Sequence, residues 1–350
     1  MKACFVASSA HPSGASSARI TLLALQFFLA CSANASVNND SLKTCLEMQG
    51  TAPSDQALEC YNRVAQEQLA QGMAEKHPEP HVKERSRSLA AEWTPSDELL
   101  RVYKQNYFLV YSHSSRPNDT PASPNPDNQV AASYPLDNKE MKFQISIKGH
   151  MLGEKRHTLW FGYTQLSFYQ IYDGAHSNPF RESNYEPELI YSYRPESPVP
   201  RGVMNASMLN VGFVHQSNGQ TLPRSRSWNR LYIQVGLEKD FGDNGKLALL
   251  PRWWKRIGGG TSDDDNPDIT SYLGHGDLEA RYYKGKLVLS ALARRRSLQI
   301  DLAFQTPELL GIQIKNSNLH LQLFDGYGES LIDYNQRHHT IGFGISLPFE

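Results

Sequence analysis

The sequence predicts an all-β fold: a 12-stranded antiparallel transmembrane β-barrel preceded by a short helical N-terminal segment. From about residue 102 the chain consists of roughly ten-residue stretches of alternating polarity separated by turn residues, and about twelve such stretches can be counted. The polar face of the clearest stretches carries Arg, Glu and Gln, which suits a polar lumen and not the dry core of a small soluble barrel. An even number of strands also lets a barrel close without a free edge.

Composition agrees with a barrel and limits the function. The 350 residues carry 35 Lys and Arg against 36 Asp and Glu, so no overall field attracts nucleic acid or an acidic partner. A hydrophobic content of 39%, 17 Tyr and a mean hydropathy of −0.52 describe a polar chain rich in aromatic residues. This profile suits a soluble β protein or an outer-membrane barrel and excludes a helical membrane protein. Any function must therefore come from local sites.

Residues 1–35 are expected to be a cleavable signal peptide that exports the chain. Arg19 precedes the apolar stretch ITLLALQFFLAC, which is too short to span a bilayer comfortably, and an A-x-A cleavage site ends at Ala35. A lipoprotein cysteine at Cys31 is the alternative, although the residues before it fit that signal poorly.

Residues 36–101 are expected to form a periplasmic helical segment and a linker. Ala, Gln, Glu and Leu recur at helical spacing from Ser41 onwards, and a connector rich in Pro, Glu, Arg and Ser follows. Removal of the signal leaves Cys45 and Cys60, and the oxidising envelope favours a disulfide between them. The barrel domain then covers residues 102–350.

Side-chain parity in two neighbouring strands predicts which face is the outside. In LNVGFVHQS, His215 and Ser217 share a face with the large apolar residues, and in NRLYIQVGLE, Asn229 shares a face with Leu231 and Ile233. The opposite faces carry most of the polar residues. Because a membrane barrel turns aliphatic side chains to lipid and polar ones to its lumen, all three polar residues are expected on the lipid-facing outside.

The strand count assigns the connections to two rims. With the N-terminus in the periplasm, the long connections share the extracellular rim: 114–138, 173–184, 217–228, 257–270 and 326–336. The short ones are periplasmic turns: 151–156, 240–245, 283–286 and 306–312. The run Arg294–Arg296 also falls on the extracellular rim and is interpreted as a patch facing lipid phosphates. The tryptophans are expected to include residues of the interfacial girdle: Trp160, Trp228, Trp253 and Trp254.

His215, Ser217 and Asn229 form a candidate catalytic triad. Period two brings the imidazole near enough to take the serine proton, and Asn229 can sit beside His215 across the hairpin and fix its tautomer. A neutral amide stabilises imidazolium less than a carboxylate does, so another positive centre is expected to help with developing negative charge. For His215 and Ser217 alone, the competing interpretation is a pair of ordinary polar rim residues.

Several blocks of the chain resemble the signature blocks of outer-membrane phospholipase A, a calcium-dependent family of 12-stranded barrels: HQSNG, SRSWNRLY, SNPFRESNYEPEL, DDNPDIT and GYGESLIDYN. The resemblance runs from about Asn106 to Phe349. It implies that Ser217 is the nucleophile, His215 the general base and Asn229 the orienting third member. It also implies hydrolysis of phospholipid acyl esters at the sn-1 or sn-2 position, in the outer membrane, by a homodimer that forms when two barrels pair.

The resemblance further implies Ca2+ at the subunit interface, where it supports the oxyanion. Carried over by position, the metal ligands are Ser177 of the partner subunit, the main-chain carbonyl of Gln220, Ser225 and Asp265. These are the hard oxygen donors that calcium prefers, and the ion supplies the expected positive centre. Leu222 stands where relatives can carry an acid, which weakens the case for a second calcium site.

Two other functions remain open at this point. A non-enzymatic outer-membrane channel or adhesin is the first alternative, because a polar lumen can conduct solutes; a pore, however, needs no His-x-Ser on its lipid face. A soluble periplasmic sandwich or lectin-like domain is the second, and the polar faces of the strands argue against it.

Overall fold

The computed structural model describes residues 56, 59, 60, 62–64, 88–131, 135–176, 180–260, 263–305 and 317–348. The chain divides into two compact units, Met1–Glu84 and Arg85–Glu350. The described residues of the first unit are helical, in agreement with the expected helical segment, and Cys60 is disulfide-bonded. The expected signal peptide and Cys45 lie outside the described residues.

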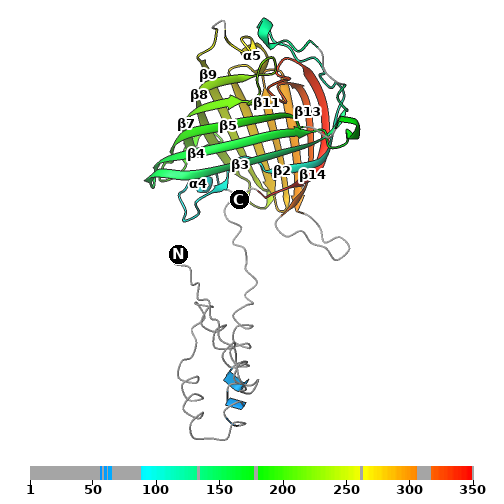
Figure 1. The fold of residues 1–350 in the computed structure, drawn as a ribbon. Helices are drawn as coiled ribbons and strands as arrows, with labels where there is room; N and C mark the ends of the chain where they lie inside the picture. Colours follow the sequence, from blue (N-terminus) through cyan, green and yellow to red (C-terminus); the bar gives the residue numbers. More distant parts are fainter. Residues whose placement is uncertain are drawn as a thin grey trace, which may run out of the picture. The chain divides into compact units, whose positions relative to one another are not determined.

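The second unit is a closed antiparallel barrel (Figure 1). Its described residues form twelve long strands: β2 (Tyr107–Ser114), β3 (Lys139–Glu154), β4 (His157–Tyr169), β5 (Phe180–Tyr193), β7 (Met204–Ser217), β8 (Ser227–Asp240), β9 (Lys246–Ile257), β10 (Gly276–Lys284), β11 (Leu287–Arg294), β12 (Ser297–Gln305), β13 (Asn318–Tyr327) and β14 (Arg337–Ser346). Each strand pairs with the next, and β14 pairs with β2 to close the ring. The short strands β1 (Arg101–Val102) and β6 (Val199–Arg201) pair with β3 and β7. The predicted fold and its closure are confirmed.

Burial along the strands follows the predicted parity. Val211 and Phe213 of β7 are exposed, whereas Asn210 and Val214 on the other face are buried. Each of the twelve long strands exposes at least one large apolar side chain. The outside of the barrel therefore carries the apolar band that contact with lipid requires. Among the described residues, no helix combines the length and hydropathy needed to cross a bilayer.

Of the four tryptophans expected to include residues of the interfacial girdle, one lies on the outside of the barrel. Trp253 is exposed on the outside, but Trp160, Trp228 and Trp254 are buried on the lumen face. Trp228 and Trp254 meet edge to face, with ring centroids 6.3 Å apart, and the Arg230 guanidinium lies 4.1 Å from the Trp228 centroid. These rings fill the lumen instead of marking the membrane interface.

A segment preceding the first barrel strand enters the lumen, and we call residues 88–93 the plug. It contains the short helix α4 (Leu89–Glu92), drawn in Figure 1 at the end of the barrel opposite α5 (Ile269–Leu273). Leu89 and Trp93 are buried in one apolar cluster with lumen residues of the strands. The Leu89 amide donates to Glu238 over 3.0 Å, and Glu92 pairs with Arg281 at 3.3 Å. The plug is thus held by both apolar and ionic contacts.

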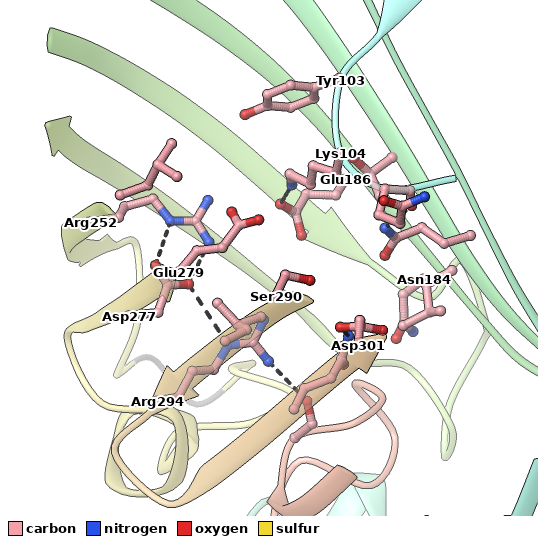
Figure 2. Close-up of a pocket in the computed structure, with 18 of the residues that line it drawn as sticks. Tyr103, Lys104, Asn184, Glu186, Arg252, Asp277, Glu279, Ser290, Arg294 and Asp301 are labelled. Atoms are coloured by element: carbon pink, nitrogen blue, oxygen red, sulfur yellow. Dashed lines mark hydrogen bonds and ion pairs between the residues drawn. The ribbon is translucent and has the colours of Figure 1, made fainter. Parts of the chain in front are cut away.

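Between the plug and the opposite rim the lumen keeps a cavity of about 170 Å³. Its lining includes Trp93 of the plug and Leu331 of the connection after β13. Figure 2 shows charged side chains extending into it from several strands. Lys104 pairs with Glu186 at 2.7 Å, and Arg252 pairs with Asp277 at 2.6 Å. Opposite charges therefore neutralise one another inside the barrel, as buried charges require.

The five long connections share one rim, as the strand count predicts. They follow β2, β4, β7, β9 and β13, which are the first, third, fifth, seventh and eleventh of the twelve long strands and therefore run in the same direction in the antiparallel ring. Their side chains contact one another: Asn118 donates to Asp333 over 3.0 Å, and Asn335 donates to the Ala122 carbonyl over 2.9 Å. The predicted connection 173–184 is too long, since β5 already begins at Phe180. We call this end of the barrel the loop rim.

Candidate active site

His215 and Asn229 are directly opposed on β7 and β8, close to the loop rim. His215 Nδ1 lies 2.8 Å from Asn229 Oδ1. Because an amide oxygen can only accept, the imidazole donates from Nδ1, and in the neutral ring Nε2 keeps its lone pair. Both side chains are partly buried. The contact predicted across the hairpin is therefore formed, and it sets the histidine to act as a base.

Ser217 lies two residues beyond His215 on the same outer face, opposite Ser227 of β8. The pairing of β7 with β8 is regular from Met208 to Ser217, so no bulge separates the two side chains. Within the described residues no hydrogen bond joins the Ser217 hydroxyl to the imidazole. Just below the pair, Phe213 is 42% exposed and Leu231 49% exposed. The hydroxyl thus sits where an apolar outer wall meets a polar rim.

The connection 218–226, which we call the active-site loop, is closed by one asparagine. The Asn218 amide donates to the Arg226 carbonyl over 3.0 Å, and the Asn218 side-chain oxygen accepts from the Arg226 amide, also over 3.0 Å. Gly219 has φ +62°, and a Cβ there would lie 3.2 Å from the Tyr185 ring. Glycine therefore allows the chain to turn sharply directly after Ser217-Asn218.

Oxygen donors gather beside Ser217. The Asp265 carboxylate accepts from the Ser225 hydroxyl over 2.8 Å and from the Ser227 hydroxyl over 3.2 Å. Asn128, which is fully buried, donates to the same carboxylate over 3.3 Å, and its side-chain oxygen has no hydrogen-bond partner among the described residues. Hydroxyl, carboxylate and amide oxygens fit a calcium ion.

The predicted calcium ligands are only partly brought together. Ser225 and Asp265 are in contact, and Gln220 belongs to the same active-site loop as Ser225. Ser177 lies outside the described residues. No group of three or more His, Cys, Asp or Glu side chains that could hold a metal occurs in the part of the chain described. A site built mainly from hydroxyl and carbonyl oxygens does not need such a group.

Arg226 is a buried cation that nothing in the local sequence pattern distinguishes. It is 0% exposed and donates to the carbonyls of Asn128, Pro223 and Ser225, over 3.1, 3.3 and 2.7 Å. Burial lowers the pKa of its guanidinium, and the surrounding acidic groups oppose that shift only in part. Arg226 thereby ties the active-site loop to the connection between β2 and β3.

A second network holds the connection 328–336 on the loop rim. Asp333 pairs with Arg181 at 2.6 Å, and Glu329 pairs with Lys142 at 2.9 Å. Burial alone would raise the pKa of both carboxyls, but the neighbouring cations outweigh it and hold each pKa below its ordinary value. Both groups therefore remain charged in the folded protein well into the acid range.

Comparison with known proteins places this geometry in a family. A family model described as phospholipase A1 matches residues 85–347, which begins where the second unit begins. The chain is 38% identical over 263 residues to a putative phospholipase A1 of Neisseria meningitidis, covering 71% of this chain and 65% of that relative. The chain thus spans just under two thirds of the length of this relative.

Two solved structures share the fold. The Salmonella typhi outer membrane phospholipase dimer with bound calcium matches with a TM-score of 0.63 at 30% identity, over 75% of this chain and 98% of that one. An active-site mutant of Escherichia coli outer membrane phospholipase A, in which asparagine is replaced by alanine, matches with a TM-score of 0.62 at 28% identity, over 76% and 98%. The family model, the sequence relative and the shared barrel agree, and the chain belongs to the phospholipase A1 family of outer-membrane phospholipases.

Proposed function

We propose that the chain is a calcium-dependent phospholipase A of the outer membrane, which hydrolyses phospholipid acyl esters at the sn-1 or sn-2 position. The observation that supports this most is the 2.8 Å contact between His215 and Asn229 on the lipid-facing outside, with Ser217 on the same face. An asparagine is also part of the active site of the Escherichia coli relative. A phospholipid diffusing in the membrane plane reaches this face without leaving the bilayer.

In the proposed reaction, Ser217 Oγ attacks the ester carbonyl carbon while its proton passes to His215 Nε2. The tetrahedral intermediate collapses when Nε2 gives that proton to the departing lysolipid oxygen, which leaves an acyl group on Ser217. Water, deprotonated by the same nitrogen, then releases the fatty acid. Asn229 Oδ1 holds the Nδ1 proton throughout, so the ring keeps the tautomer that both steps need.

Calcium is the proposed cofactor. Its ligands would be the Gln220 carbonyl, Ser225, Asp265 and Ser177 of the partner subunit, and the Salmonella typhi relative binds calcium as a dimer. When bound, the ion stabilises negative charge on the carbonyl oxygen under attack. The oxygen cluster around Asp265, beside Ser217, supports this assignment.

The active state is proposed to be a homodimer in the outer membrane, reached after removal of residues 1–35. The closed barrel with its apolar outer band, and the dimeric relative, support that location and assembly. The lumen does not favour the channel alternative, because the plug and paired charges such as Arg252 with Asp277 occupy it.

The decisive experiment compares wild-type protein with Ser217→Ala in phospholipid hydrolysis, with and without calcium. We expect the variant to fold and to lose hydrolysis by at least about a thousandfold, and chelation to stop the wild-type enzyme. Ser297→Ala, at the start of β12 on another part of the ring, is the matched control and should keep full activity. Wild-type rates in Ser217→Ala would overturn the assignment.

A further inference from the structure

A buried carboxylate lies directly against the active-site loop. Glu182 of β5 is 1% exposed. Its Oε2 accepts from Gln220 Nε2 over 2.6 Å and from Asn218 Nδ2 over 3.3 Å. Its Oε1 accepts from Asn184 Nδ2 over 2.6 Å and from the Ile332 amide over 3.2 Å. One side chain thus joins the loop that follows Ser217 to the connection 328–336.

The contact with Asn218 reaches the whole loop. Asn218 Oδ1 accepts from the amides of Gln220 and Arg226 over 3.3 and 3.0 Å, and its Nδ2 also donates to the Arg224 carbonyl over 2.8 Å. Glu182 orients the side-chain amide that makes these contacts. Displacing Glu182 would therefore release both ends of the loop, together with the main chain at Gln220.

The carboxyl group of Glu182 has no ion-pair partner among the described residues. All four donors are neutral amides, and the adjacent Arg181 pairs with Glu140 and Asp333 instead. Arg226, the buried cation of the same loop, donates to main-chain carbonyls. Glu182 is therefore held by hydrogen bonds, and both of its oxygens are used to order the active-site loop and the connection 328–336.

We propose that Glu182 is a positioning residue for the active-site loop, and that its hydrogen bonds hold the main chain at Gln220 where its carbonyl can bind calcium. This rests on the proposed function, since it takes the calcium site from there. Glu182 acts on the ion through Gln220: its carboxylate holds the side chain of the residue whose carbonyl is the ligand. Loss of such an outer-shell partner weakens metal binding by about 10- to 100-fold.

The test titrates calcium into the full-length protein in detergent by calorimetry and, separately, follows hydrolysis against calcium concentration. Glu182→Gln keeps the shape but replaces one acceptor oxygen by an amide donor, so that two of the four hydrogen bonds are lost. We expect a calcium Kd about 10- to 100-fold higher, with near-wild-type kcat once calcium is saturating. Glu188→Gln is the matched control: it removes a buried carboxylate on the same strand that pairs with Lys104, and it should leave the Kd unchanged.

A second variant keeps the proposal testable if Glu182→Gln does not fold. Gln220→Met preserves the main-chain carbonyl and removes the amide that donates to Glu182, and it should also raise the calcium Kd. Labelling of Ser217 by a fluorophosphonate in the presence of EDTA reports loop position without calcium, and it should be slower in Gln220→Met than in wild type.

The outcomes separate this inference from the proposed function. Calcium-dependent wild-type hydrolysis with an unchanged calcium Kd in folded Glu182→Gln, or in Gln220→Met, overturns the role of Glu182 alone. Wild-type protein that binds no calcium and does not label at Ser217 overturns the proposed function first. If wild type labels at Ser217 but binds no calcium, the role of Glu182 in calcium binding is overturned, and the labelling rate of Gln220→Met decides its role in positioning the loop.

Discussion

Replacing Asn229 with alanine tests how much the third member contributes. The change removes the acceptor that lies 2.8 Å from His215 Nδ1. During attack the imidazole takes up the Ser217 proton and becomes charged, and a hydrogen bond to a charged group is worth about 1.5–3 kcal/mol. At about 1.4 kcal/mol per tenfold in rate, this corresponds to a loss of roughly 10- to 150-fold in kcat. Both side chains are only partly buried, so water replaces some of the bond, and we expect the lower part of that range.

The assay is phospholipid hydrolysis in mixed micelles at saturating calcium, with kcat and KM determined separately. The loss should fall on kcat, because Asn229 acts on the base and not on substrate binding. Asn229→Asp keeps an acceptor oxygen and should retain more activity than alanine. Gln234→Ala is the control: it removes a lumen-facing contact, 3.3 Å from Asn210, between the same two strands. An Asn229→Ala enzyme within twofold of wild type would refute the role given to this contact.

Three further predictions follow from the rim and the plug. Because Asp333 and Glu329 have lowered pKa values, their contribution to stability is complete above about pH 5 and is lost as the pH falls further. Asp333→Asn should therefore remove part of the acid-induced drop in the thermal unfolding midpoint. Trp93→Ala deletes a buried ring and should destabilise the barrel by about 3–5 kcal/mol, measurable as a lower midpoint of denaturant unfolding. Leu222 is 57% exposed, so Leu222→Asp should cost little stability. The added carboxylate should lower the calcium concentration needed for half-maximal hydrolysis, and an unchanged calcium requirement would contradict the placement of Leu222 beside the calcium site.

Much of the fold follows from the sequence because a strand has a period of two. Alternation alone assigns His215, Ser217 and Asn229 to the outside, and counting strands assigns the long connections to one rim. The burial of the strands and the contacts across the rim agree with both assignments. The sequence predicts a connection up to residue 184, whereas β5 begins at Phe180. Arg181, Glu182 and Asn184 resemble loop residues because they are polar, but these side chains are buried inside the barrel.

The supporting contacts of the site could not be predicted in this way. Glu182 and Arg226 act through partners far away in the sequence, and nothing in their local pattern distinguishes them from other polar residues. Asn128 lies 97 positions before its partner Ser225. Such pairs depend on how five connections fold over one another, and alternation carries no information about that. The burial of three tryptophans could not be predicted for a related reason, since polar lumens also contain large rings.

The location of the reactive pair in a single hairpin has a consequence for biogenesis. His215 and Asn229 meet as soon as β7 pairs with β8, midway through the strand order, whereas Asn128 and Ile332 arrive from the first and last connections of the barrel. A hairpin of β7 and β8 can therefore bring the imidazole to Asn229 before the oxygen cluster beside Ser217 exists. The oxygen cluster is complete only when Asn128 of the first connection meets Ser225 and Asp265, so its assembly depends on a larger part of the ring than the pairing of His215 with Asn229 does.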